Sequence, residues 1–125
     1  FILEDNEMEI GLGIHGEAGV RKGDLKTADE ITVELMDSIL KEIGNVSKVS
    51  VLINGLGSTP LMELYIMYKK VHEILGKNSI EIHSSFVGEY VTSLEMNGAS
   101  ITIMKLDDEL QPLLEEQALC SMFKV

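Results

Sequence analysis

The chain has 125 residues, of which 45% are hydrophobic and 25% charged, and its formal net charge is −11. This acidic balance disfavours binding to nucleic acid or to an anionic membrane surface, because both need clustered lysine and arginine. With Cys120 as its single cysteine, the chain excludes an intrachain disulfide. No signal peptide and no apolar run of membrane-spanning length is visible. We therefore expect a soluble cytoplasmic protein, and the start at Phe1 suggests a piece of a longer chain.

The first third predicts a strand, a loop and a helix. Residues 8–14 alternate apolar side chains with Glu or Gly, which is typical of a strand. The glycine-rich residues 15–19 follow as a turn or functional loop. Either Thr27 or Asp29 is suited to cap a helix that runs to about Ile43, because apolar residues recur at helical spacing up to that point.

The middle of the chain repeats this order. Residues 49–53 form an apolar β-branched run, which indicates a buried strand. Residues 54–59 are rich in glycine and predict a loop. Pro60 favours the first turn of a second helix with Thr59 as its cap, and Gly76 marks its end.

The last third adds two strands and a helix. Residues 79–85 alternate again and predict a third central strand, and residues 100–106 predict another strand. Acidic residues 107–109 precede a last helix, where the helix dipole favours negative charge. Residues 88–97 fit either a loop or a helical turn.

The alternation of strands and helices predicts one α/β domain over residues 1–125. We expect a layered, mixed or mostly parallel sheet with flanking helices. The last strands are the ones that an antiparallel pairing would suit.

Two features of the sequence are candidate binding sites. The loop of residues 54–60 lies between a strand and a helix, where backbone amides can hold an anion. It lacks the Gly-Lys-Ser/Thr of a phosphate-binding loop and the third glycine of a dinucleotide site, so a structural turn is favoured. Of the histidines, His72 fits a solvated helix face and His83 a strand position. Only His15 has the small neighbours that give a ligand access to an imidazole, at a strand end where α/β folds place ligands.

Four segments together resemble the substrate-binding subunit of dihydroxyacetone kinases. They are Gly-Leu-Gly-Ile-His-Gly-Glu-Ala-Gly at residues 11–19, Val-Leu-Ile-Asn-Gly-Leu-Gly-Ser-Thr-Pro-Leu-Met-Glu-Leu at residues 51–64, Thr-Ser-Leu-Glu-Met-Asn-Gly-Ala-Ser at residues 92–100, and Lys-Leu-Asp-Asp-Glu-Leu at residues 105–110. They fall in the order of that family and extend over nearly the whole chain up to Leu110. The tail of residues 114–125 departs from the aromatic and proline-rich ending expected of the kinase subunit.

The resemblance implies that His15 is the catalytic and substrate-binding residue. In this family the histidine of the first loop attacks the C2 carbonyl of dihydroxyacetone and forms a covalent hemiaminal, which selects carbonyl compounds over glycerol. A neutral imidazole is a suitable nucleophile, and a covalent tether removes translational freedom before phosphoryl transfer. Gly16 is expected to bind substrate beside it, whereas Gly13 and Glu17 are expected to shape the loop. No metal ligand set is expected.

The resemblance also implies partners. General acid and base residues are expected in an N-terminal half of the same subunit, outside this chain. No cofactor is expected on this chain, and ATP or bound ADP is expected on a nucleotide-binding partner domain or subunit. The phosphoryl donor is either ATP or the phosphotransferase system. The resemblance implies a homodimer. Because a strand near the chain start needs partners, the fragment is expected to stay associated with its missing N-terminal portion or with a second copy.

Two rivals remain open at this point. Kinase-like paralogues act as dihydroxyacetone-sensing transcriptional coactivators and keep the histidine without turnover, and the divergent tail suits that reading. A plain structural α/β domain would form no carbonyl adduct. The upstream sequence of the intact chain would distinguish the kinase from the co-activator, because a kinase needs a general acid/base carboxylate there.

Overall fold

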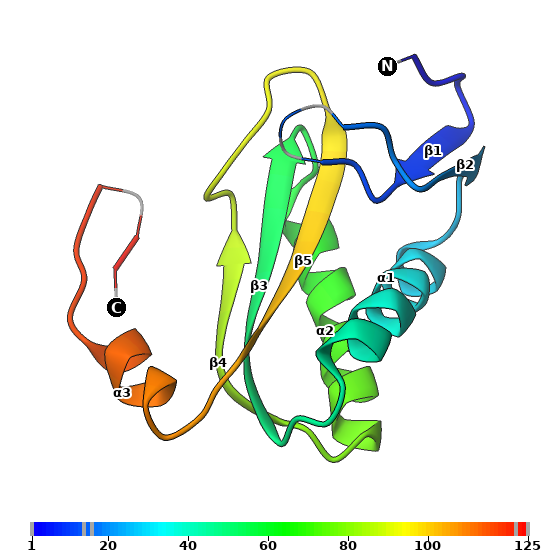
Figure 1. Cartoon of the computed structure of the whole chain (residues 1–125). Coiled ribbons are helices and arrows are strands. Elements are labelled where there is room, and N and C mark those ends of the chain that lie inside the picture. The colour runs from blue at the N-terminus through cyan, green and yellow to red at the C-terminus, as the bar shows by residue number, and fades with distance from the viewer. Residues whose placement is uncertain (1, 14, 16, 122, 125) are drawn as a thin grey trace.

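The computed structural model describes residues 2–13, 15, 17–121, 123 and 124. The elements in this part of the chain are β1 Glu7–Ile10, β2 Arg21–Asp24, α1 Ala28–Ile43, β3 Lys48–Gly57, α2 Leu61–Lys77, β4 Glu81–Gly88, β5 Asn97–Lys105 and α3 Leu110–Glu115. Figure 1 shows β3, β4 and β5 as one sheet, with α1 and α2 together on one side of it. The predicted layered α/β fold with a mixed sheet is therefore confirmed.

The main sheet has the order β4-β3-β5, with β3 in the centre. β3 pairs with β4 in parallel, from Lys48 opposite Glu81 onward, because α2 connects them as a crossover. It pairs with β5 antiparallel, from Val49 opposite Lys105 to Gly57 opposite Asn97. The prediction that residues 79–85 form a central strand is wrong in position, since β4 lies at the edge of this sheet.

β1 and β2 form a separate two-stranded antiparallel sheet, with Glu7 opposite Asp24 and Ile10 opposite Arg21. The predicted strand over residues 8–14 is too long, because β1 ends at Ile10 and Gly11 adopts a φ of 79°. β2 was not predicted. Its sequence, Arg-Lys-Gly-Asp, has no apolar alternation, so only its pairing with β1 marks it as a strand.

α1 begins where the sequence predicts. The Thr27 hydroxyl accepts a hydrogen bond from the backbone N–H of Glu30, and the Glu30 carboxylate accepts one from the backbone N–H of Thr27. This reciprocal pair satisfies two backbone donors at the helix start. The cap is thus Thr27 and not Asp29. Gly44, at a φ of 65°, ends the helix.

α2 differs at both ends from its prediction. Pro60 occupies the N-cap position and no side chain caps the helix, so the expected role of Thr59 is wrong. The helix also passes through Gly76 to Lys77, and Asn78 is its C-cap. A single glycine near the end of a helix costs only about 1 kcal/mol, which the contacts of the preceding turns offset.

The core lies between the sheet and the two long helices. Val49, Val51 and Ile53 alternate along β3 and are fully buried on the face toward the helices. Residues of both helices pack against them; the buried ones are Met36 of α1 and Leu64, Met67, Val71 and Leu75 of α2. Each such side chain stabilises the fold by about 1.5–3 kcal/mol through burial.

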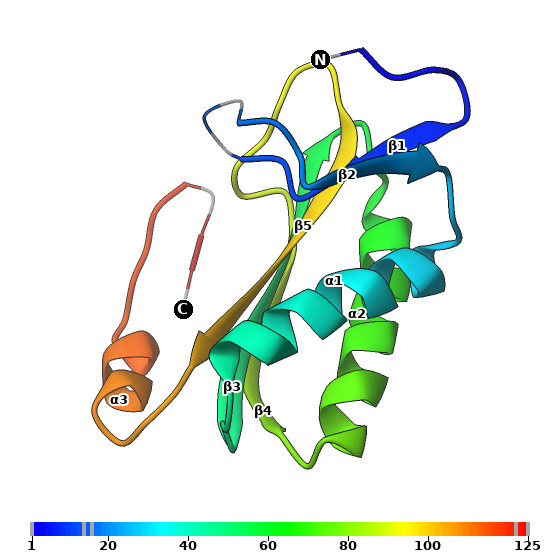
Figure 2. The same cartoon turned by 45° about the vertical axis from the view of Figure 1, so that its right-hand side comes forward.

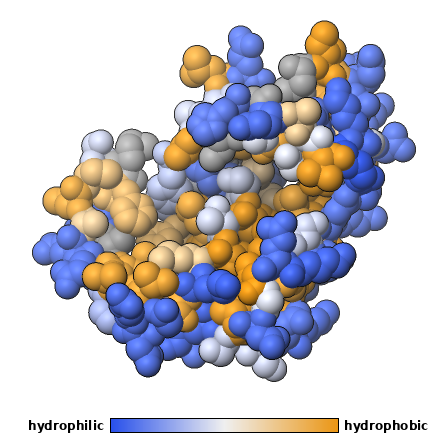
Figure 3. All heavy atoms as spheres, viewed as in Figure 1, coloured by the Kyte–Doolittle hydropathy of each residue, from blue (hydrophilic) through white to orange (hydrophobic). Residues whose placement is uncertain are grey.

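The opposite face of the sheet is covered in part by α3 and the C-terminal tail. A groove of about 380 Å³ lies there between β3, β4, β5 and the tail. Phe123 of the tail packs against Phe86, with ring centroids 5.1 Å apart, and against Tyr90 at 5.9 Å. Figure 2 shows the tail away from α1 and α2, and Figure 3 shows hydrophobic residues on both sides of the hollow.

Candidate functional site

The loop between β1 and β2 carries His15. In Figures 1 and 2 it lies at the end of the molecule where β3 ends and β5 begins. The base of the loop is closed by a hydrogen bond from the backbone N–H of Val20 to the carbonyl of Ile10, at 2.7 Å. Gly11 adopts a φ of 79°, which favours glycine, and a Cβ there would also lie 2.7 Å from Cγ2 of Val20. The hairpin therefore fixes where the loop begins and ends.

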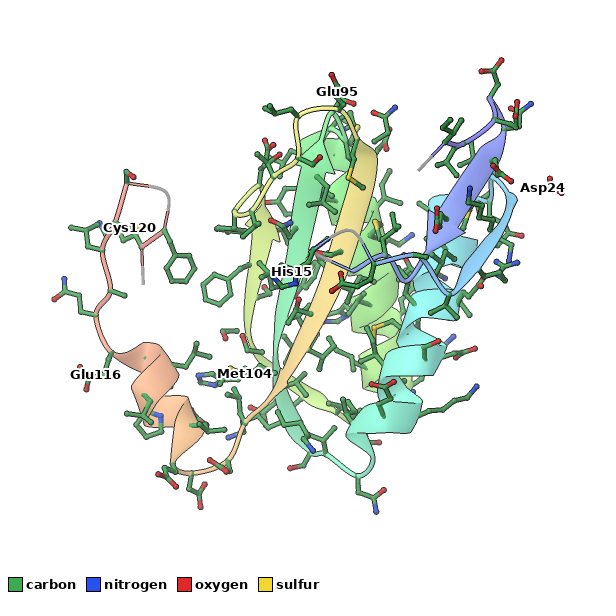
Figure 4. The ribbon with its side chains drawn as sticks, turned by 45° about the horizontal axis from the view of Figure 1, so that its top comes forward. His15, Asp24, Glu95, Met104, Glu116 and Cys120 are labelled. Carbon is green, nitrogen blue, oxygen red and sulfur yellow. The ribbon has the colours of Figure 1, made fainter. Side chains whose placement is uncertain are left out.

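His15 projects from the tip of this loop. Its side chain is 88% exposed, and Figure 4 shows it where the loop passes in front of the sheet, at the end of the hairpin opposite to Asp24. The carbonyl of Glu17 accepts a hydrogen bond from the backbone N–H of Gly13 at 3.1 Å, which closes a tight turn around His15. The imidazole is thus accessible while its backbone is held.

Glu17 contacts His15 twice. Its Oε2 accepts a hydrogen bond from the backbone N–H of His15 at 3.0 Å, and its Oε1 lies 3.5 Å from Nδ1 of the imidazole. A carboxylate on that side favours the tautomer with the proton on Nδ1. Nε2 then keeps its lone pair, which is the arrangement that a nucleophilic imidazole needs. Gly16, the other expected substrate-binding residue, lies outside the described residues.

The glycine-rich segment after residue 53 is not a free loop. β3 continues to Gly57, so only residues 58–60 connect it to α2. The N–H of Gly57 donates to Oγ1 of Thr92, and that of Ser58 donates to the carbonyl of Met96. A Cβ on Gly57 would lie 2.1 Å from that same carbonyl oxygen. These two amides are used within the chain, which agrees with a structural turn and not with an anion site.

Asn54 ties the β4–β5 connection to the sheet. Its side chain is 5% exposed; Oδ1 accepts from the backbone N–H groups of Tyr90 and Val91, and Nδ2 donates to the carbonyl of Val91. The connection of residues 89–96, which the sequence left open, contains neither helix nor strand. The second and third resembling segments are in contact through the Gly57–Thr92 and Ser58–Met96 hydrogen bonds and through the pairing of β3 with β5.

The remaining histidines have structural surroundings. His72 is exposed on α2, with its ring 6.3 Å from that of Tyr68. His83 lies within β4, and its Nε2 is 2.8 Å from Oε1 of Glu115 on α3. Neither is placed near His15 by a described contact. In the part of the chain that the structure describes, no three His, Cys, Asp or Glu side chains are grouped so as to hold a metal ion.

A charged network joins the hairpin to α1. The carboxylate of Glu34 pairs with Arg21 of β2 and with Lys26, each at 2.7 Å. The hydrogen bond from Lys26 and the charge of Arg21 hold the pKa of Glu34 below its usual value. The network lies on the surface, so it orients the hairpin more than it stabilises the fold.

The sequence singled out His15 as a candidate, but its contact with Glu17 was not predicted. Glu17 was expected to shape the loop, but the structure also places its carboxylate against the imidazole. The spacing of two residues between a histidine and a glutamate in a glycine-rich loop is a signal that could have suggested this.

None of the helices in the described residues is long and apolar enough to cross a membrane.

Comparison with known proteins places these features. The family model described as "Dak1 domain" matches residues 1–122. The dihydroxyacetone-binding subunit of a PTS-dependent dihydroxyacetone kinase of Listeria innocua is 43% identical over 127 residues, covering 100% of this chain and 38% of that protein. An L-erythrulose kinase of Pectobacterium atrosepticum is 38% identical and covers 89% of this chain and 20% of that protein.

Among the solved structures that are similar to this chain are an operon co-activator and a kinase. A dihydroxyacetone kinase operon co-activator superposes with a TM-score of 0.80 at 34% identity, covering 87% of this chain and 35% of its own. The dihydroxyacetone kinase of C. freundii superposes with a TM-score of 0.77 at 26% identity, covering 89% and 20%.

The fold is therefore that of a Dak1 domain, and the chain belongs to that family. Its relatives include dihydroxyacetone-binding kinase subunits. The chain spans less than two-fifths of the length of the Listeria subunit that it matches.

Proposed function

We propose that this chain is the dihydroxyacetone-anchoring part of a dihydroxyacetone kinase subunit, and that His15 holds the substrate covalently. The observation that carries the proposal is the exposed imidazole of His15 with the Glu17 carboxylate beside Nδ1. The similarity to dihydroxyacetone-binding subunits supports the choice of substrate.

The proposed step is a reversible addition. The lone pair of Nε2 attacks C2 of dihydroxyacetone and forms an N–C bond, while the C=O π bond breaks and its electron pair moves to the oxygen. The oxygen takes up a proton, and Nδ1 releases one. Atoms and charge balance without an oxidant or a leaving group. The Glu17 carboxylate stabilises the positive charge that develops on the imidazole, because it lies 3.5 Å from Nδ1.

Selectivity follows from this chemistry. A carbonyl carbon accepts the imidazole nitrogen and a carbinol carbon does not, so glycerol is excluded without any difference in size. Protonation removes the Nε2 lone pair, so binding weakens in acid. The erythrulose kinases among the relatives fit the same requirement for a ketone.

The proposed assembly contains more than this chain. Residues 1–125 are the C-terminal part of a longer subunit, whose N-terminal half supplies the general acid and base, and the subunit is a homodimer. ATP, or ADP that the phosphotransferase system recharges, is held by a nucleotide-binding partner domain or subunit. Gly16 contributes to substrate binding. This assembly is consistent with the share of the Listeria subunit that the chain matches.

The test of the adduct uses dihydroxyacetone labelled with ¹³C at C2. Addition to wild-type protein should convert the carbonyl signal to that of a carbon bearing nitrogen and oxygen, saturating at one equivalent per chain. His15→Ala should abolish that signal, whereas His72→Ala should retain it. A persisting signal in His15→Ala, or equal affinity for glycerol, would contradict the proposal.

A co-activator that senses dihydroxyacetone is the second candidate. Of the two solved structures, the operon co-activator is more similar to this chain, at 34% identity, than the C. freundii kinase at 26%, whereas the Listeria kinase subunit is 43% identical. Both functions predict the same adduct. They separate in a phosphoryl-transfer assay of the intact protein with ATP or the phosphotransferase components, where formation of dihydroxyacetone phosphate identifies the kinase.

A further inference from the structure

Glu9 is a buried carboxylate at the base of the His15 loop that the proposed addition does not use. It lies on β1, and its side chain is only 4% exposed. Its Oε1 accepts a hydrogen bond of 2.7 Å from the backbone N–H of Gly19, ten residues further along the chain. The bond therefore joins β1 to the arm of the loop that returns to β2.

The burial of Glu9 is energetically costly. Within the described part of the chain, its Oε2 is buried and has no hydrogen-bond partner. The ammonium of Lys22 lies 3.9 Å from Oε2, which offsets part of the charge without a hydrogen bond. An apolar residue at such a position is often as stabilising or more so. A carboxylate that breaks this rule is typical of a functional site.

Glu9 is also in tight contact with the returning arm. A Cβ on Gly19 would lie 2.4 Å from Cγ of Glu9 and 2.8 Å from the carbonyl oxygen of Ile10. Glycine at position 19 is what allows the backbone to approach the carboxylate. The hydrogen bond from Gly19 to Glu9 and the close packing of these two residues together determine how far the arm lies from β1.

The same arm carries the group that orients the histidine. Glu17 is two residues before Gly19, its carbonyl closes the turn with Gly13, and its carboxylate contacts both the backbone and the imidazole of His15. A displacement of Gly19 therefore displaces Glu17 and changes the direction of Nε2. The path from Glu9 to His15 consists of two carboxylates and a short stretch of backbone.

We propose that Glu9 is a positioning residue, which holds the returning arm through Gly19 and thereby keeps Nε2 of His15 aimed for carbonyl addition. This inference rests on the proposed function of His15. A covalent tether needs its nucleophile within a narrow range of distance and direction, so loosening the loop reduces the adduct without removing any reacting group.

The experiment compares variants of Glu9 in the intact protein. Glu9→Met removes the acceptor at similar volume and should weaken the dihydroxyacetone adduct by about tenfold or more, the loss expected for one charge-assisted hydrogen bond. Glu9→Gln retains an acceptor for the Gly19 N–H and should restore the affinity to within about threefold. Glu7→Met is the matched control on the same side of β1, and it should leave the adduct unchanged. The adduct is measured with the ¹³C-labelled ketone.

A second measurement reports on the loop itself. Hydrogen exchange of the Gly19 amide should be protected in wild type and in Glu9→Gln and lose protection in Glu9→Met. The rate at which diethyl pyrocarbonate carbethoxylates His15 should differ between wild type and Glu9→Met. The rate at His72 should be the same in both proteins. If wild type forms no adduct, the proposed function fails, and these two measurements still decide whether Glu9 positions the loop.

Three outcomes would overturn the inference. One is a Gly19 amide that stays protected in Glu9→Met. Another is an adduct of unchanged affinity after that protection is lost. Should Glu9→Met not fold, Glu9→Asp takes its place, since it keeps the charge but withdraws it by one methylene. A several-fold weaker adduct is then expected, and an affinity equal to wild type is the third contrary outcome.

Discussion

β3 and the loop that carries His15 are held in different ways. β3 is hydrogen-bonded along both of its edges, and its side chains toward the helices are fully buried. The loop is exposed at its tip and is held by a few hydrogen bonds, two of which end on carboxylates. The stability of the domain therefore resides in the sheet, whereas the proposed reactivity resides in a segment that contributes little to that stability. Substitutions should separate the two properties.

The largest effect on stability is expected in the core. Ile53→Ala removes a fully buried side chain from β3 and should lower the free energy of unfolding by about 2–5 kcal/mol. Chemical denaturation measures the loss. Ile66→Ala is the matched control, because Ile66 is 43% exposed on α2 and should cost far less. Similar losses for the two variants would contradict the assignment of the core.

A smaller effect is expected where the hairpin joins α1. Thr27→Ala removes the side chain that caps α1 and should cost about 1 kcal/mol, by the usual effect of losing an N-cap. Thr59→Ala provides the comparison, because no side chain caps α2 and its N-cap is Pro60. Thermal unfolding should therefore distinguish two threonines that look alike in the sequence. Equal losses at both positions would show that Thr59 is a cap after all.

The charged network should give a smaller, pH-dependent contribution. The pKa of Glu34 in the folded chain is lowered from its usual 4.5, so its contribution is fully present above that value and is lost as the pH falls through the lowered pKa. Unfolding midpoints followed from pH 6 downward should decline less steeply in Glu34→Gln than in wild type. The control Glu42→Gln, exposed on the same helix, should follow the wild-type curve. High salt should reduce the difference, because the groups lie at the surface.

The smallest effect on stability is expected at His15. His15→Ala should change the free energy of unfolding by less than about 0.5 kcal/mol, since the side chain is 88% exposed. Its adduct with dihydroxyacetone should nevertheless be lost. His83→Ala should show the reverse, with an intact adduct and a measurable loss of stability, because it removes a side chain that is only 22% exposed together with its 2.8 Å contact to Glu115. A destabilised His15→Ala protein would show that the loop supports the fold.

The helices and the central strand were predictable because their patterns have local causes. The apolar spacing of α1 and the capping pair of Thr27 and Glu30 are visible in the sequence, and so is the β-branched run of β3. β2 was not predictable, because its strand conformation depends on pairing with β1 and not on its own side chains. The length of β3 was underestimated for a similar reason: Asn54 to Gly57 read as a loop, yet β5 pairs with them.

The candidate site was predictable only in part. His15 stood out through its neighbours and through resemblance, whereas the spacing of His15 and Glu17 could only suggest their contact and could not give its geometry. Glu9 was hidden because it alternates with apolar residues, as an exposed strand residue would. Its burial arises from the loop folding back over it, a contact between residues ten positions apart.

The central position of β3 has a consequence for how the chain acquires its structure during synthesis. Val49 pairs with Lys105 in β5, and Lys48 pairs with Glu81 in β4. Neither pairing can form before the later residue of the pair has been synthesised. A ribosome-bound chain that ends between these points exposes one bare edge of an apolar strand, which is prone to pair with other chains. Nascent chains released before residue 105 should therefore depend on chaperones, and those released after it should close the sheet unaided.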